Sequence, residues 1–128
     1  MQIKKLTPNL IVRNVEASLK FYREVLGLET AMTVPEQAPY VFAGVSNGAV
    51  EVFFNDQKVV AAEYPKLAET IGASMTMYME VDSLDAVLER VKEAGAKISM
   101  PVTEQFYGMK EFAFEDGDGY TVTIAEKM

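Results

Sequence analysis

The side chains that could do chemistry in this sequence are carboxylates, hydroxyls and phenols, because it contains neither histidine nor cysteine. Without cysteine there are no disulfides, zinc thiolate sites, iron–sulfur clusters or cysteine nucleophiles. Without histidine, no serine or threonine has the partner that a catalytic triad needs. One acid, Glu51, lies inside the apolar run from Ala49 to Phe54. Hydrogen bonding, charge pairing and catalysis by a lone carboxylate are the chemistries that remain.

Two further acids, Asp116 and Asp118, alternate with glycines near the end of the chain. Carboxylates so close together could bind calcium, but the twelve-residue spacing of an EF-hand is absent. A tight turn between two strands explains the segment from Asp116 to Gly119 instead. No glycine-rich phosphate loop follows a predicted strand. We therefore expect neither a bound metal nor a cofactor.

The first half of the chain reads as a strand, a helix and three more strands. Asn14 offers an N-cap to a helix from Val15 to Leu26 with helical apolar spacing, and Gly27 ends it. An Asn47-Gly48 pair predicts a hairpin between the last two strands. The four predicted strands are Leu6–Arg13, Leu28–Val34, Tyr40–Val45 and Ala49–Asn55.

The second half repeats this order. Asp82 or Ser83 caps a helix from Leu84 to Ala94, and Gly95 ends it. Aligning the two helices gives a period of about seventy residues. The predicted strands are Ser74–Val81, Ala96–Met100, Met109–Glu115 and Tyr120–Glu126.

This repeat predicts one α+β domain built from two βαβββ modules. The first module covers residues 1–56 and the second residues 73–128, and the connector of residues 57–72 contains a short helix around Pro65–Ile71. Helices can cover one face of the curved mixed sheets while the other face surrounds a cavity. The architecture therefore predicts a concave binding site.

The net charge of −7 argues against several partners. It repels nucleic acid and anionic membrane surfaces, and no run of residues is long and apolar enough to span a membrane. Since there is also no signal peptide pattern at the start, we expect a cytoplasmic protein. The same charge attracts cationic ligands, although solubility alone explains the acidity of most acidic proteins.

Two segments, Leu10–Glu29 and Tyr107–Ile124, resemble the vicinal oxygen chelate superfamily of glyoxalases, bleomycin resistance proteins and extradiol dioxygenases. The resemblance spans essentially the whole chain and implies paired βαβββ modules. It also implies a homodimer, with modules that pair either within one chain or across two.

Enzymes of this superfamily hold a divalent metal with histidine or glutamate side chains from the first and last strand of each module. The resemblance places these four positions at Thr7, Glu51, Thr76 and Thr123. Only Glu51 suits a metal, because neutral hydroxyls bind divalent ions weakly. A carboxylate-only site would need Glu80 and Glu111 beside Glu51. The resemblance is therefore closest to the metal-free, antibiotic-binding branch.

Strand alternation then names the wall of the cavity, because residues two apart point the same way. The predicted wall is mixed in character, whereas the opposite, helix-facing parity is almost wholly apolar. The wall comprises Thr7, Asn9, Ile11, Ala49, Glu51, Phe53, Ser74, Thr76, Tyr78, Glu80, Thr121, Thr123 and Ala125. The helix-facing set comprises Leu10, Val12, Val50, Val52, Phe54, Met77, Met79, Val122 and Ile124.

Two features of the predicted cavity, one at its mouth and one in its wall, have alternative interpretations. In bleomycin resistance proteins an aromatic residue before a glycine lines the drug groove, so Phe106 and Tyr107 are either stacking residues or ordinary loop packing. Glu51 either pairs with a ligand amine, or acts as a base with a raised pKa, or is a former metal position now hydrogen-bonded to Thr76 or Thr123.

The sequence thus favours non-catalytic binding and sequestration of a small aromatic molecule, of the antibiotic-resistance type, with a cationic ligand suited to the charge. We predict ligand contacts from Thr7, Asn9, Glu51, Phe53, Thr76, Tyr78, Phe106, Tyr107, Glu111 and Thr123. One alternative is a glyoxalase-like lyase or isomerase that uses Glu51 as base or as its sole retained metal ligand. Another is a domain that serves in dimerisation or regulation with a collapsed cavity.

Overall fold

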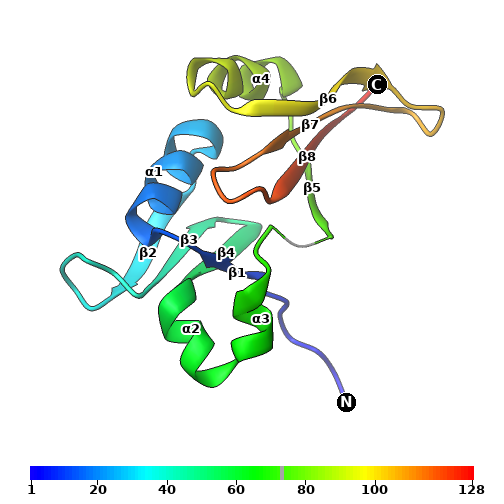
Figure 1. Cartoon of the computed structure of the whole chain (residues 1–128). Helices are drawn as coiled ribbons and strands as arrows, with labels where there is room; N and C mark the ends of the chain where they lie inside the picture. Colours follow the sequence, from blue (N-terminus) through cyan, green and yellow to red (C-terminus); the bar gives the residue numbers. More distant parts are fainter. Residues whose placement is uncertain (73) are drawn as a thin grey trace. The chain divides into compact units, whose positions relative to one another are not determined.

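A computed structural model describes residues 1–72 and 74–128 of the chain. Its helices and strands follow the predicted order, with one additional helix (Figure 1). The elements are β1 (Asn9–Val12), α1 (Val15–Leu26), β2 (Glu29–Val34), β3 (Phe42–Asn47), β4 (Val50–Asp56), α2 (Gln57–Glu63), α3 (Pro65–Glu69), β5 (Thr76–Glu80), α4 (Leu84–Glu93), β6 (Lys97–Glu104), β7 (Met109–Glu115) and β8 (Thr121–Lys127). None of the helices in these ranges is long and apolar enough to cross a membrane.

The strands form two four-stranded sheets with the same internal order. The first runs β1-β4-β3-β2 and the second β5-β8-β7-β6. In each, the first and last strands of the module pair in parallel, and the other pairs are antiparallel. The predicted α+β fold of two βαβββ modules is confirmed.

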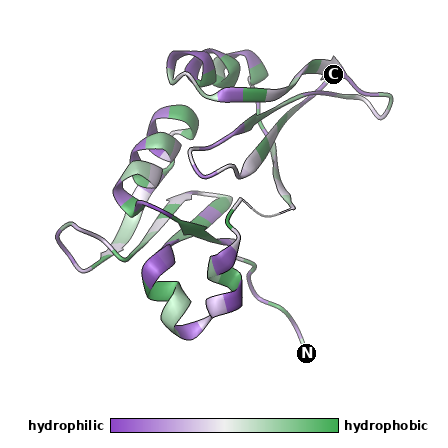
Figure 2. Cartoon of the chain, viewed as in Figure 1, coloured by the Kyte–Doolittle hydropathy of each residue, from purple (hydrophilic) through white to green (hydrophobic). Residues whose placement is uncertain are grey.

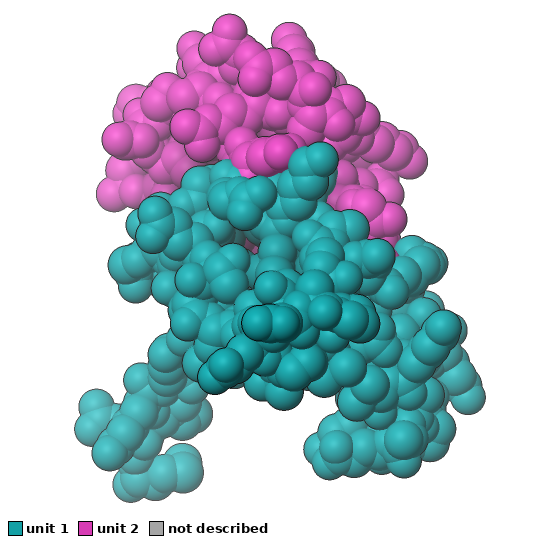
Figure 3. Space-filling model, turned by 90° about the vertical axis from the view of Figure 1, so that its left-hand side faces the viewer, with its two compact units in different colours: residues 1–23, 27–71 teal, residues 24–26, 72–128 magenta. Residues whose placement is uncertain are grey.

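The chain divides into two compact units, which Figure 3 colours separately. Unit 1 comprises residues 1–23 and 27–71, and unit 2 comprises residues 24–26 and 72–128. The connector helices α2 and α3 therefore belong to unit 1, where α2 contacts β1 and β4.

Helix α1 begins and ends where its sequence signals predict. The Asn14 side chain accepts a hydrogen bond from the Ala17 N–H at 2.9 Å, as an N-cap should. Gly27 takes a left-handed conformation with φ of 66°, and its N–H donates to the Arg23 carbonyl. On the buried side of the helix, the Tyr22 ring lies 5.1 Å from that of Phe54 in β4. This contact joins the helix to the sheet of unit 1.

In unit 2, α4 lies against β7 and β8. Of the two capping candidates, Ser83 is the N-cap, and its side chain accepts from the Ala86 N–H. The helix alternates hydrophilic and hydrophobic residues, which Figure 2 shows by colour, and it buries Leu84 and Val91. Most residues of the predicted helix-facing set are buried across the two units: Leu10, Val12, Val52, Phe54, Met77, Val122 and Ile124.

Two strands differ in length from the prediction. The first was expected over Leu6–Arg13, but β1 is only Asn9–Val12, because Pro8 has no N–H to continue the ladder. The Pro8 carbonyl still accepts from the Phe53 N–H at 2.9 Å. Conversely, β6 extends to Glu104, beyond the predicted end at Met100. Two register shifts along β6 break the alternation by which a strand is recognised.

The sequence prediction missed α2 altogether. The Asp56 carboxylate caps this helix by accepting from the Lys58 and Val59 N–H groups. Helix α3 was predicted and begins at Pro65, although it ends at Glu69, before the expected Ile71. The predicted hairpin is also displaced by one residue, since Asn47 pairs with Val50 and the turn is formed by residues 48 and 49.

Candidate functional site

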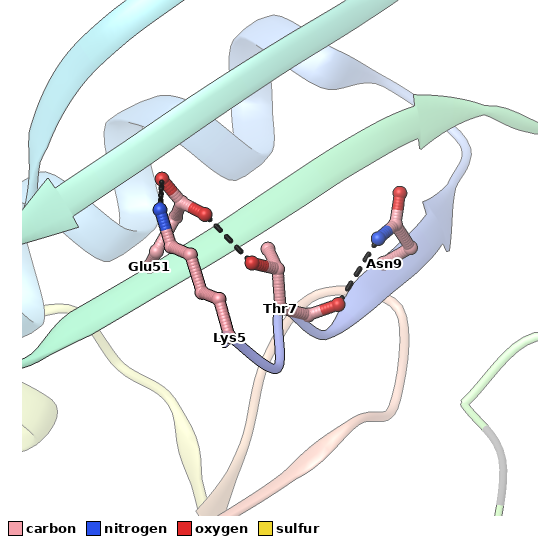
Figure 4. Close-up of polar contacts among 4 residues, drawn as sticks. All are labelled: Lys5, Thr7, Asn9 and Glu51. Atoms are coloured by element: carbon pink, nitrogen blue, oxygen red, sulfur yellow. Dashed lines mark hydrogen bonds and ion pairs between the residues drawn. The ribbon is translucent and has the colours of Figure 1, made fainter. Parts of the chain in front are cut away.

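Glu51 of β4 is held by two residues from the segment that precedes β1 (Figure 4). The Thr7 hydroxyl donates to Glu51 Oε1 at 2.6 Å, and Lys5 Nζ lies 2.9 Å from Oε2. The parallel pairing of β1 with β4, in which Asn9 is opposite Phe53, brings these residues together. Thr7 itself lies just before β1, not on it as predicted.

These contacts determine the charge of Glu51. The Thr7 hydrogen bond, followed by the hydrogen bond and charge of Lys5, lowers the pKa of this carboxyl below its usual value. The alternative in which Glu51 is a base with a raised pKa is therefore wrong, and an ionised, ion-paired carboxylate is a weak general base. The alternative in which Glu51 bonds to Thr76 or Thr123 stays a prediction, because it joins the two units; within unit 1 the partners of Glu51 are Thr7 and Lys5.

The same face of unit 1 continues with amide and aromatic groups. Asn9 donates from its side chain to the Thr7 carbonyl, and Asn55 donates to Asn9 Oδ1 at 3.2 Å. The rings of Phe53 and Phe42 meet edge to face, with centroids 5.0 Å apart. Asn9, Glu51 and Phe53 thus share a surface that is polar at one place and aromatic at another.

In unit 2, the two predicted threonines contact each other. Thr76 of β5 and Thr123 of β8 lie with their hydroxyl oxygens 2.6 Å apart. Thr123 is buried, and Thr76 is exposed. Because each hydroxyl is already hydrogen-bonded, this pair offers a ligand less than two free hydroxyls would.

A second polar group of unit 2 is the Tyr78–Glu111–Tyr107 cluster. Glu111 of β7 is only 3% exposed. The Tyr107 hydroxyl donates to its two carboxylate oxygens at 2.7 and 2.8 Å, and the Tyr78 hydroxyl donates to Oε2. The two phenols thereby satisfy a carboxylate that would be costly to bury alone.

Glu111 in turn keeps the phenols protonated. Its hydrogen bond, together with burial and its negative charge, raises the pKa of Tyr78 from 10.0 to about 12. The same causes raise the pKa of Tyr107. Both tyrosines therefore donate their protons to Glu111 throughout the physiological pH range.

Phe106 and Tyr107 lie in the loop between β6 and β7. The Gln105 N–H donates to the Met109 carbonyl and the Gly108 N–H to the Gln105 carbonyl, and Gly108 takes φ of 86°. The Phe106 side chain is 99% exposed and meets the Tyr107 ring edge to face at 5.2 Å. Loop packing thus explains Tyr107 in part, but it does not explain Phe106.

Sequence reasoning missed Lys5 entirely, and it named Glu111 and both tyrosines without connecting them. The strand register connects two of them, since Tyr78 is opposite Thr123 and Glu111 is opposite Ala125. Thr123 and Ala125 are two residues apart on β8, so Tyr78 and Glu111 face the same side. No sequence signal placed Lys5, which precedes the first strand.

The residues at the four metal positions of the resemblance do not fit a metal. Glu51 is already bound by a threonine and a lysine, and Thr76 and Thr123 bind each other. Three neutral hydroxyls and one ion-paired carboxylate are a poor donor set for a divalent transition metal. Within residues 1–72 and 74–128, no group of three or more acids that could hold a metal ion is found.

The comparisons with known proteins agree on the fold. The model of the Glyoxalase/Bleomycin resistance protein/Dioxygenase superfamily matches residues 3–124. Among solved structures, the chain is similar to the hypothetical protein SA1046 from S. aureus, with a TM-score of 0.81 and 21% identity over 98% of this chain and 95% of that one.

Two further structures are about as similar. TioX from Micromonospora sp. ML1 has a TM-score of 0.78 and 16% identity over 98% of this chain and 99% of its own. A glyoxalase/bleomycin resistance protein/dioxygenase family enzyme from Burkholderia phytofirmans PsJN has a TM-score of 0.77 and 23% identity, covering 95% and 97%. At such identities the likeness extends to the fold alone. No curated protein matches the sequence.

Proposed function

Because the chain belongs to the Glyoxalase/Bleomycin resistance protein/Dioxygenase superfamily, we propose that it binds and sequesters a small aromatic molecule without catalysing its reaction. The observation that carries the proposal is the pairing of Thr7 with Glu51 and of Thr76 with Thr123. Side chains at the metal positions of the superfamily bind one another, so the site is left with hydrogen bonding and stacking.

The available surfaces suit an aromatic guest. In unit 1, Phe53 pairs with Asn9 in the strand register and lies two residues from Glu51 on the same face of β4, and in unit 2 Phe106 and Tyr107 present exposed rings. Flat apolar contact with a few fixed polar groups is the usual composition of small-molecule sites. The net charge of −7 favours a cationic guest over an anionic one.

The proposal follows the metal-free, antibiotic-binding branch in its biology as well. We propose that the protein acts as a cytoplasmic homodimer and confers resistance by binding a toxic compound. The ionised state of Glu51 supports binding over catalysis, since its lowered pKa suits an ion pair better than proton abstraction.

Isothermal calorimetry against bleomycin-type, mitomycin-type and enediyne compounds tests the proposal. We expect saturable heat with the native protein and weaker binding in the Phe53→Ala and Tyr107→Ala variants. Tyr64→Ala is the matched control, because Tyr64 is an exposed aromatic residue at the end of α2. Absence of heat with all three classes would count against sequestration.

Metal analysis of protein purified without chelators is the second arm of the test. Stoichiometric zinc, nickel, iron or manganese would contradict a binding protein without a metal and would favour a metal lyase. Trace, substoichiometric metal would agree with the poor donor set of the four positions.

A further inference from the structure

Nothing in the fold of unit 2 requires a carboxylate at position 111. On the same face of the sheet, the next residue of that parity on β7 is Ala113, and the residue opposite Glu111 on β8 is Ala125. A buried carboxylate costs stability unless it is fully hydrogen-bonded, whereas an apolar residue would not carry that cost. A buried charge capped by two tyrosines therefore calls for an explanation beyond packing.

The cluster has a definite donor and acceptor pattern. A phenol has one proton, and Tyr78 and Tyr107 both direct theirs to Glu111. Each phenol oxygen can then offer only lone pairs to any other group. The cluster consequently presents acceptors, backed by a negative charge, and it suits a ligand that brings N–H donors and positive charge.

The rings above Glu111 are available for stacking. Tyr78 is 51% exposed and Tyr107 is 52% exposed, and Phe106 extends the aromatic surface. Glu80, on the same strand face as Tyr78, adds negative charge, although Lys127 lies 3.8 Å from it. Aromatic faces next to a carboxylate are the usual surroundings of a bound organic cation.

We propose that the Tyr78–Glu111–Tyr107 cluster recognises a protonated amine on an aromatic ligand, with the phenol oxygens accepting its N–H groups. This inference rests on the proposed function and specifies its ligand class as an aromatic primary or secondary ammonium compound. Glu111 acts through the tyrosines by fixing their protons and supplying charge.

Three probes of similar shape test the inference on the full chain. Tryptamine carries a positive charge and ammonium N–H donors. Its N,N,N-trimethyl derivative carries the charge without ammonium N–H donors, and tryptophol has a neutral hydroxyl in place of the ammonium group. Affinities come from chemical-shift titrations of the native protein and of Glu111→Gln, Tyr78→Phe and Tyr107→Phe. Tyr64→Phe, which removes an exposed phenol outside the cluster, is the matched control.

We expect the native protein to bind tryptamine about tenfold more tightly than tryptophol, with the trimethyl derivative between them, since hydrogen bonds to charged groups have about this effect. Glutamine at position 111 keeps the shape of the side chain but has only one acceptor oxygen, so one phenol proton turns outward. The Glu111→Gln variant should therefore lose the preference for tryptamine over tryptophol. Each phenylalanine variant should reduce the preference, and Tyr64→Phe should preserve it. Far-UV circular dichroism checks that each variant folds.

Four results would overturn the inference, and three of them are no binding of tryptamine, equal affinity for all three probes, and a preference that survives both tyrosine substitutions. The fourth is equal binding of tryptamine and its trimethyl derivative, which would refute the acceptor role of the phenol oxygens. The calorimetry with antibiotics gives its answer independently of these titrations. Failure of this inference can therefore be distinguished from failure of the proposed function. If Glu111→Gln does not fold, the tyrosine variants still give the answer.

Discussion

Replacing Glu111 with glutamine should let Tyr78 ionise at a pH where the native protein keeps it protonated. The glutamine side chain has the same shape, but it lacks the negative charge and the second acceptor oxygen that hold the phenol proton. In the native protein these raise the pKa of Tyr78 from 10.0 to about 12. The substitution should therefore lower the pKa of Tyr78 most of the way back toward 10.0.

The size of the effect follows from the two pKa values. At about pH 11, a phenol with a pKa near 10 is about 90% ionised, and one with a pKa near 12 is about 10% ionised. Of the six tyrosines, Tyr78 should therefore contribute most of one additional phenolate to the variant, and Tyr107 should add to it because its pKa is raised as well.

Near-ultraviolet absorbance of phenolate, followed against pH, measures this difference. Circular dichroism at each pH confirms that both proteins remain folded, and Tyr64→Phe shows the amplitude of one exposed phenol. Superimposable titration curves for native protein and Glu111→Gln, both folded, would refute the argument that the carboxylate holds these protons.

The raised pKa of Tyr78 also predicts how the free energy of unfolding depends on pH. Because folding raises the pKa of Tyr78, the stability that its hydrogen bond contributes is fully present below the unfolded pKa of about 10. This contribution is lost as the pH rises through about 12. Native protein should therefore lose stability over this range more steeply than Tyr78→Phe.

Three other substitutions test separate parts of the structure. Glu51→Gln should make the free energy of unfolding less dependent on pH in the acid range, because folding lowers the pKa of Glu51 and the stability that its ionised form contributes is lost as the pH falls. The same change of urea midpoint with pH in the native protein and in the variant would contradict this. Asn14→Ala should cost about 1 kcal/mol in urea unfolding by removing the N-cap of α1, and no measurable loss would refute that role. Gly72→Ala should lower the melting temperature more than Gly95→Ala: both glycines have positive φ, but only at Gly72 would a Cβ meet a backbone oxygen, at 2.7 Å. Equal losses would show that this close approach is unimportant.

Most of the fold could be predicted because its signals are local. Asn14 and Gly27 mark the ends of α1 through hydrogen bonds within a few residues, and the alternation of β5 needs only neighbours along the chain. The misses have equally local causes. A proline shortens β1, register shifts obscure β6, and the capping signal of Asp56 was not recognised as the start of α2.

The candidate site was predicted as a set of positions but not as a set of contacts. Strand parity put Glu51 and Thr7 on one face, but the interpretations left open for Glu51 included a base with a raised pKa, whereas the hydrogen bonds of Thr7 and Lys5 lower it. A pKa depends on which donors approach within hydrogen-bond distance, and parity states only the side on which a residue lies.

The amino-acid sequence by itself determined the two repeated modules, the acidic charge and the chemistry excluded by the lack of histidine and cysteine. Only the tertiary structure decided which groups meet: Lys5 with Glu51 across 46 residues, Thr7 with Glu51 across 44, and Tyr78 with Glu111 across 33. The reason is physical. Helix caps and strand alternation arise from interactions between near neighbours, whereas these contacts exist only after strand pairing brings distant segments side by side.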